Sequence, residues 1–225
     1  MKFLKNLFQK PVIIINFKTY KQGKQVIKLA KQIEKATINS KYKIIIGIQP
    51  TDIYELAKLV KNKRSKIEIF SEHADYFKVG RNTGFILPEA IKVDGAQGTF
   101  LNHSEHHLDF NTLKLTIERC KKINLKTAVF VKNLSEAKKV EKIKPSYLIY
   151  EPPELVSGKT SVSQAKPSII KKFSETIKTR FLVGAGIHTE EDFKIALQLG
   201  ASGIAISSAI VKTKNPGKKL MEMIG

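Results

Sequence analysis

Short runs of β-branched residues alternate along the chain with segments in which apolar residues recur at helical spacing. The first run, Val12-Ile13-Ile14-Ile15, contains no polar residue, which is typical of a strand buried on both faces of a sheet. In residues 22–38, apolar side chains then return at helical spacing, at Val26, Ile27, Leu29, Ala30 and Ile33. That spacing predicts a helix with one buried face.

The same order of strand and helix repeats to the end of the chain. Strands are expected at residues 12–15, 44–48, 67–70, 98–101, 127–131, 147–150, 181–183 and 203–206, and helices at 22–38, 52–60, 88–93, 109–121, 135–143, 167–178, from Thr189 onward and at 216–224. Eight such units without a break in composition predict a single-domain (β/α)8 TIM barrel over residues 1–225. A doubly wound open sheet is the alternative, but no glycine-rich dinucleotide-binding motif follows the first strand.

The composition fits a folded chain with a strongly basic surface. Of 225 residues 42% are hydrophobic, and 40 Lys+Arg against 20 Asp+Glu give a net charge of +20. This charge attracts anions, which include nucleic acid, lipid head groups and phosphorylated metabolites. The lysines are spread over every predicted helix, without an arginine-rich arm or a basic stripe with aromatic residues. We therefore expect no nucleic-acid partner, and a nucleic-acid-binding protein is the alternative that the charge leaves open.

The sequence has one cysteine and no long apolar stretch. Cys120 excludes an internal disulfide, and its helical context predicts a packed thiol. Residues 1–10 lack an apolar region long enough for a signal peptide, and no stretch is long enough to cross a bilayer. These observations predict a cytoplasmic protein without a membrane partner.

One predicted strand ends in a carboxylate. Glu151 follows the apolar run at 147–150 and is itself followed by Pro152-Pro153. A strand cannot continue through two prolines, because each lacks a backbone N–H and fixes φ. Glu151 should therefore stand at the carboxyl-terminal rim of the barrel, where such folds place their chemistry. An ordinary surface glutamate before a loop is the alternative.

Other polar or small residues follow further strands and should meet at the same rim. They are Asn16 and Lys18 after the first strand, His103 after the fourth, Gly184-Ala185-Gly186 after the seventh and Ser207-Ser208 after the eighth. The last two groups predict an anion site, since small-residue turns that open helices offer free backbone N–H groups. Alternatively, the glycines serve a tight turn, the serines cap a helix, and Lys18 pairs with Glu105.

His103 permits two interpretations. With His106 it forms an H-x-x-H pattern, which suits a metal if a further ligand comes from elsewhere. Alternatively, Ser104-Glu105 opens a helix, and the helix dipole then disfavours the protonated imidazole. A neutral imidazole can both donate and accept a hydrogen bond, which suits enediol chemistry.

Four segments together resemble triosephosphate isomerase, in particular its short archaeal-type form. They are Ile14-Ile15-Asn16-Phe17-Lys18-Thr19-Tyr20, Leu101-Asn102-His103-Ser104-Glu105, Tyr150-Glu151-Pro152-Pro153-Glu154-Leu155 and Val183-Gly184-Ala185-Gly186-Ile187. They occur in the family's order, and the resemblance extends from residue 11 to about residue 216. It implies the interconversion of glyceraldehyde 3-phosphate and dihydroxyacetone phosphate, in glycolysis and gluconeogenesis, without a cofactor or a metal.

The resemblance also implies roles for individual residues. Glu151 would be the base, His103 would polarise and protonate the two oxygens, and Lys18 would stabilise the enediolate together with Asn16. Residues 151–161 would form a lid that closes over the substrate. The remaining substrate-binding residues would be Val156, Gly186, Ser207 and Ser208.

The sequence departs from the family at several positions near this site. Ser157-Gly158-Lys159 stands where the family usually has Gly-Thr-Gly, His106 where it has arginine, Phe130 where it commonly has cysteine, and Ser208-Ala209 where it has Ser-Gly. None of these changes removes a group that moves a proton. A catalytically weakened barrel that binds phosphorylated metabolites is therefore the alternative function.

A long irregular segment, residues 72–87, follows the third predicted strand. Its Thr83-Gly84, with Pro88-Glu89-Ala90 beyond it, resembles the loop through which subunits of the family contact one another. Long loops in compact domains usually bind a partner or a ligand. We therefore expect self-association, as a homodimer or a homotetramer.

Overall fold

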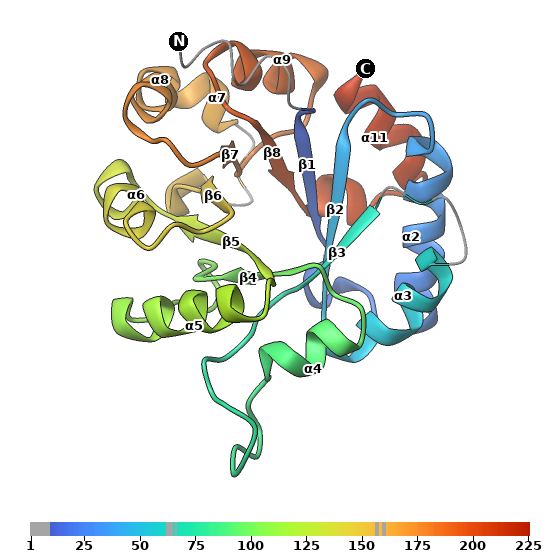
Figure 1. Cartoon of the computed structure of the whole chain (residues 1–225). Coiled ribbons are helices and arrows are strands. Elements are labelled where there is room, and N and C mark those ends of the chain that lie inside the picture. Colours follow the sequence, from blue (N-terminus) through green and yellow to red (C-terminus); the bar gives the residue numbers. More distant parts are fainter. Residues whose placement is uncertain (1–9, 62–64, 66, 156–157, 159–160) are drawn as a thin grey trace.

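The computed structural model describes residues 10–61, 65, 67–155, 158 and 161–225 (Figure 1). Residues 1–9 lie outside the described residues, so the structure does not test the expectation that residues 1–10 form no signal peptide. The substrate-binding position expected at Val156 lies outside the described residues as well.

Parallel strands form a closed barrel in sequence order, with β1 pairing to both β2 and β8. The strands are β1 (Val12–Asn16), β2 (Lys43–Ile48), β3 (Ile67–Ser71), β4 (Gly98–Leu101), β5 (Lys126–Val131), β6 (Tyr147–Tyr150), β7 (Phe181–Val183) and β8 (Gly203–Ile206). Every predicted strand is present, and no boundary differs from the expected one by more than one residue. The structure therefore confirms the (β/α)8 barrel and excludes the open sheet.

Helices surround the barrel (Figure 1). They are η1 (Lys18–Tyr20), α2 (Lys24–Thr37), η2 (Pro50–Asp52), α3 (Ile53–Lys61), α4 (Pro88–Val93), α5 (Phe110–Lys122), α6 (Leu134–Glu141), η3 (Pro153–Leu155), α7 (Val162–Ala165), α8 (Pro167–Thr176), α9 (Glu190–Gln198), α10 (Ser208–Val211) and α11 (Pro216–Ile224). The short helix α7 lies between the segment expected as a lid and the helix expected at 167–178, and it is not among the predicted helices. Its first turn is stabilised because the side chain of Ser161 accepts a hydrogen bond from the backbone N–H of Gln164.

Helix α9 begins where the sequence predicts. The hydroxyl of Thr189 accepts a hydrogen bond from the backbone N–H of Asp192, and the Asp192 carboxylate accepts one from the backbone N–H of Thr189. This capping box satisfies two backbone donors that a helix start leaves free. The same carboxylate also accepts from the backbone N–H of His188 at 3.0 Å. The loop between β7 and α9 is therefore tied to the first turn of the helix.

The strands are buried on both faces, as the continuous apolar runs predict. One face packs against the helices, and the other fills the barrel interior with a second apolar cluster that includes Phe70, Phe100 and Phe130. Glycine makes room for these rings: a Cβ on Gly47 would lie 1.9 Å from Phe100, and one on Gly98 would lie 2.4 Å from Phe70. Small residues opposite large ones thus close-pack the barrel centre.

Residues 72–87, between β3 and α4, extend away from the barrel (Figure 1). The base of this segment is closed by Asp75, whose backbone N–H donates to the carbonyl of Ile86 and whose carboxylate accepts from the Ile86 N–H. Phe77 stacks between neighbouring aromatic rings, with a centroid distance of 4.2 Å to Phe85. Val79 is 76% exposed and Phe85 51% exposed. The segment therefore presents apolar side chains to its surroundings.

Two further expectations concern single features. Cys120 is buried and unpaired, and burial raises the pKa of its thiol to about 12, which confirms a packed thiol. Among the helices of the described residues, none has the length and apolar character that crossing a membrane requires.

Candidate active site

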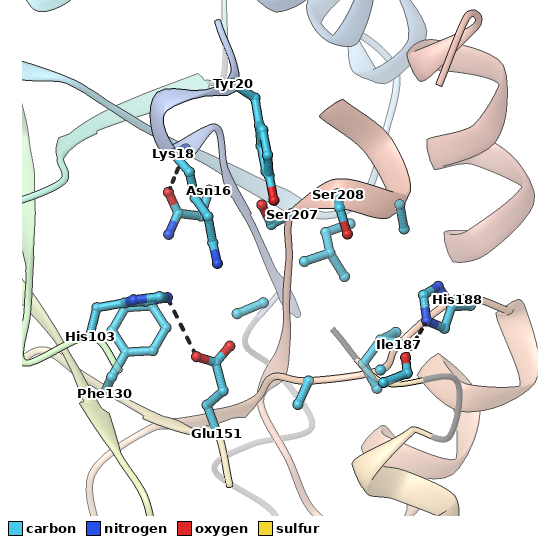
Figure 2. Close-up of a pocket in the computed structure, with 16 residues that line it drawn as sticks. Asn16, Lys18, Tyr20, His103, Phe130, Glu151, Ile187, His188, Ser207 and Ser208 are labelled. Atoms are coloured by element: carbon cyan, nitrogen blue, oxygen red, sulfur yellow. Dashed lines mark hydrogen bonds and ion pairs between the residues drawn. The ribbon is translucent and has the colours of Figure 1, made fainter. Parts of the chain in front are cut away.

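The rim residues expected from the sequence line one cavity at the carboxyl ends of the strands (Figure 2). Of the expected rim residues that the structure describes, all but Gly184 line it: Asn16, Lys18, His103, Glu151, Ala185, Gly186, Ser207 and Ser208. In Figure 2, the side chains of Lys18, His103 and Glu151 come from separate elements and point toward a common space. The fold therefore brings together groups that lie far apart in the sequence.

Glu151 directly follows β6, and its Oε2 lies 3.4 Å from Nε2 of His103. Gly184 allows this placement, because a Cβ there would lie 2.9 Å from Oε1 of Glu151. Burial raises the pKa of Glu151 to about 7, with Lys18 opposing the rise and Glu105 adding to it. Oε2 has no hydrogen-bond partner among the described residues. The carboxylate is thus poised to gain or lose a proton near neutral pH.

His103 is held in one tautomer by the backbone. The N–H of Glu105 donates to Nδ1 at 3.0 Å, so Nδ1 is unprotonated and the neutral ring carries its proton on Nε2, on the side of Glu151. Burial, and then the charge of Lys18, lower the pKa of His103 to about 4, although Glu105 acts in the opposite direction. The imidazole is therefore neutral at physiological pH.

The reason expected for this neutral histidine is wrong. Ser104 and Glu105 form a turn, and the next helix, α5, begins only at Phe110. A helix dipole at His103 is therefore not the cause of its low pKa. Ser104-Glu105 has the composition of a helix start, but the side chain of Glu105 binds Lys18 and caps no helix.

Lys18 lies in a strained backbone conformation with φ of 47°, which costs a residue other than glycine about 1–2 kcal/mol. The Oδ1 of Asn16 accepts the backbone N–H of Lys18 at 3.0 Å and stabilises this turn. Nζ of Lys18 lies 2.8 Å from Oε1 of Glu105. The pairing considered from the sequence is thus confirmed, and the lysine lines the cavity as well.

The turns after β7 and β8 form the opposite side of the cavity. Ala185 and Gly186 both have positive φ, 69° and 66°. Ser207 precedes α10 but makes no side-chain capping hydrogen bond, so the helix-cap interpretation is wrong for its hydroxyl. Its Oγ is buried without a partner among the described residues. Free N–H groups at the start of α10 and this hydroxyl make the side suitable for an anion.

Several residues around the cavity were not expected as site residues. They include Tyr20, Phe130 and His188. Tyr20 is part of a segment that resembles the family and Phe130 is a departure from it, but the resemblance assigns neither residue a role. Nε2 of His188 lies 3.1 Å from the carbonyl oxygen of Gly158, so it must donate there. His188 follows the seventh predicted strand, and this position is the sequence signal that could have identified it as a site residue.

Glu72 directly follows β3 at the same rim but does not line the cavity, and it was not among the expected rim residues. Burial, and then the charge of Glu105, raise its pKa to about 7. Its Oε1 is buried without a partner among the described residues. The signal was available, because Glu72 is a polar residue at the end of a predicted strand.

The H-x-x-H interpretation of His103 receives no support from the geometry. The ring of His106 stacks on His73, with centroids 4.2 Å apart. Within residues 10–61, 65, 67–155, 158 and 161–225, no cluster of three His, Cys, Asp or Glu side chains could hold a metal.

A barrel with a titratable carboxylate, a neutral imidazole and an ammonium group around one rim cavity has the architecture of a (β/α)8 enzyme built for acid–base chemistry on a small anionic substrate. The family model described as triosephosphate isomerase matches residues 11–224. The chain belongs to the triosephosphate isomerase family.

Individual relatives agree with this assignment. The chain is 38% identical to triosephosphate isomerase of Saccharolobus solfataricus over 220 residues, which cover 95% of each chain. It is 36% identical to that of Methanocaldococcus jannaschii, over 95% of this chain and 98% of the relative. A solved triosephosphate isomerase from Bartonella henselae superposes with a TM-score of 0.68 at 18% identity, covering 88% of this chain and 92% of that one. The last likeness supports the fold alone.

Proposed function

We propose that this chain is an active aldose–ketose isomerase that interconverts glyceraldehyde 3-phosphate and dihydroxyacetone phosphate. The observation that carries the proposal is the convergence of Glu151, His103 and Lys18 on one cavity, with 3.4 Å between Oε2 of Glu151 and Nε2 of His103. Family membership supports the choice of substrate.

Glu151 is the proposed base. It takes a proton from the carbon beside the substrate carbonyl and returns it to the adjacent carbon, so that the reaction needs no external oxidant or reductant. A pKa of about 7 suits this task, because the group can be ionised before the transfer and protonated after it. Triosephosphate isomerases are the standard example of a glutamate base beside a neutral histidine, so these roles follow from the family as much as from the geometry.

His103 and Lys18 act on the substrate oxygens, and Asn16 positions Lys18. The Nε2–H of neutral His103 donates to the carbonyl oxygen and stabilises the enediolate that forms when Glu151 removes the carbon proton. His103 then gives this proton to that oxygen, which leaves an enediol and an imidazolate, and the imidazolate takes the proton of the other oxygen and becomes neutral again. Lys18 places a positive charge beside the developing negative charge. Asn16 holds the backbone turn that positions Lys18.

The phosphate of the substrate is proposed to lie against Gly186, Ser207 and Ser208. The buried hydroxyl of Ser207 lacks a partner among the described residues, and a phosphate oxygen would supply one. Val156 is proposed to contact the substrate from the lid, residues 151–161.

No observation favours the weakened, binding-only alternative. Phe130 and His106 differ from the family's usual residues, yet the carboxylate, imidazole and ammonium groups share one cavity. Ser157 and Lys159 of the altered lid lie outside the described residues.

We infer further that residues 1–225 act as one catalytic domain in the cytoplasm, within glycolysis and gluconeogenesis. Self-association is proposed through residues 72–87, which carry Thr83-Gly84 and the exposed Val79 and Phe85. Light scattering distinguishes a dimer from a tetramer, and a monomer at micromolar concentration contradicts this part of the proposal.

A coupled assay with either triose phosphate tests the activity. The unmodified chain should turn over, and Glu151→Asp should reduce kcat by about a hundredfold, because the shorter side chain withdraws the carboxylate by about 1 Å. Glu118→Asp is the matched control, since Glu118 lies on α5 with 47% of its side chain exposed, and it should leave kcat unchanged. No turnover by the folded chain would reject the function, and tight binding of phosphoglycolate without turnover would favour the alternative.

A further inference from the structure

We propose that Phe130 is a positioning residue of this site, whose ring fixes the orientation of the His103 imidazole and keeps water from the space between His103 and Glu151. This inference rests on the proposed function, because it concerns how that function's acid–base pair is held in place.

Phe130 lies on β5, between the strands that carry the two reactive groups. It pairs with Ile149 of β6, two residues before Glu151, and it is 3% exposed at the floor of the cavity. Its ring centroid lies 4.6 Å from that of His103, with the ring planes at 75°. Edge-to-face contacts of this kind are directional. Figure 2 shows the Phe130 ring directly against the His103 ring.

Phe130 is itself supported from within the barrel. Its ring meets Phe100 edge to face, with centroids 5.7 Å apart, and Phe100 meets Phe70 at 5.8 Å. The absence of side chains at Gly47 and Gly98 makes room for Phe100 and Phe70. A column of three rings therefore extends from the barrel interior to the cavity floor and ends on His103.

The imidazole is thus fixed by two different contacts. The backbone N–H of Glu105 binds Nδ1 and sets the tautomer, but one hydrogen bond leaves the ring free to rotate about that bond. The aromatic contact of Phe130 restrains this rotation and keeps Nε2 directed into the cavity that His103 shares with Glu151. Precise placement of reacting groups matters, since a displacement of about 1 Å can cost a hundredfold in rate.

Phe130 acts on His103 in a different way from the charged residues around it. Glu105 and His107 face it from its own loop, Lys18 from the loop after β1, and Glu151 from the end of β6. Phe130 carries no charge, so its ring acts on the imidazole of His103 by excluding water from it. Removing the ring should therefore shift the imidazole pKa upward, toward its ordinary value.

The test compares Phe130→Leu with Phe193→Leu in the full-length chain. Both variants replace a buried aromatic ring with a smaller apolar side chain, but Phe193 lies on α9, meets the ring of Tyr42 edge to face and does not line the cavity. Two quantities are measured: steady-state kinetics of the isomerase reaction, and the titration of the His103 ring by NMR, with the signal assigned from a His103→Gln spectrum.

Phe130→Leu should lower kcat about tenfold with KM changed less than about twofold, and should raise the His103 pKa by about one unit. Phe193→Leu should leave both quantities close to those of the unmodified chain, even where its melting temperature falls. Equal effects of the two variants on kcat and on the His103 titration would overturn the proposal.

The NMR titration also separates this inference from the proposed function. If the unmodified chain is inactive while Phe130→Leu still shifts the His103 titration, the isomerase proposal fails and the role of Phe130 in holding the imidazole stands. If the chain is active and Phe130→Leu leaves kcat and the His103 titration unchanged, the role of Phe130 fails and the isomerase proposal stands.

Discussion

Nε2 of His103 lies 3.4 Å from Oε2 of Glu151, although β5 separates the two strands that these residues follow. Burial acts on both groups in opposite directions, since it raises the pKa of Glu151 to about 7 and lowers that of His103 to about 4. Both shifts favour the uncharged form. At neutral pH the contact is therefore not an ion pair between an imidazolium and a carboxylate, but a neutral imidazole beside a carboxyl group near its own pKa.

The first prediction concerns the titration of Glu151. With a pKa of about 7, the carboxyl is protonated at pH 5.5 and ionised at pH 8, so the rate constant kcat/KM should rise with pH through that window. The pKa itself is measured in the free protein by ¹³C NMR of the carboxyl carbons, with Glu151→Gln identifying the signal. A midpoint near 4.5 would show that burial does not control this group.

The second prediction concerns stability. A carboxyl group whose pKa is raised in the folded protein favours folding while it is protonated. The contribution of Glu151 to the free energy of unfolding is therefore complete below pH 4.5, the ordinary pKa of a glutamate, and is lost as the pH rises through about 7. At pH 8, Glu151→Gln should therefore be more stable than the unmodified chain by about 1–3 kcal/mol.

Urea unfolding of both proteins at pH 4.5 and pH 8 checks this second prediction. Glu72 also has a pKa of about 7, but it is present in both proteins and its contribution cancels in the difference. A stability difference that does not change with pH would contradict the prediction.

The third prediction concerns the ion pair between Lys18 and Glu105, with 2.8 Å between Nζ and Oε1. Glu105→Gln removes the charge that holds the ammonium group, so kcat/KM should fall by about ten- to a hundredfold through misplacement of Lys18. The backbone N–H that binds His103 is unchanged by this substitution. Glu118→Gln, on the exposed face of α5, is the control, and equal losses in the two variants would reject the explanation.

The fourth prediction concerns the hydroxyl of Ser207. Because its Oγ is buried without a partner among the described residues, Ser207→Ala should raise the free energy of unfolding by about 1 kcal/mol, since burying an unpaired hydroxyl costs free energy. Loss of one hydrogen bond to a charged phosphate should raise KM about tenfold. Calorimetry and steady-state kinetics measure the two effects, and a destabilised variant with unchanged KM would assign the hydroxyl a structural role instead.

Much of the fold could be predicted because its signals are local. A continuous β-branched run such as Val12–Ile15 can hardly be anything but a buried strand, and Pro152-Pro153 must end the strand before it. The capping residues Thr189 and Asp192 fix the start of α9 in the same way. Helix ends were less accurate: the helix expected at 135–143 ends at Glu141.

The chemistry of His103 could be predicted only in part, because it depends on distant residues. Its neutral state was expected, but from a helix that does not form. The causes are its burial and Lys18, which the barrel brings beside it. Phe130 carries no distinguishing sequence signal, since an aromatic residue in a buried strand is ordinarily part of the core. Glu72 and His188 follow strands and could have been found by applying the rim argument to every strand end.

Isomerisation in D2O tests the central claim most directly, because it follows the proton that Glu151 is proposed to move. Unlabelled glyceraldehyde 3-phosphate should yield dihydroxyacetone phosphate with deuterium on the carbon that receives the proton, since a carboxyl group exchanges its proton with solvent. Glu151→Gln should abolish both turnover and labelling. Rapid turnover by Glu151→Gln, or turnover of the unmodified chain with no deuterium in the product, would contradict the account.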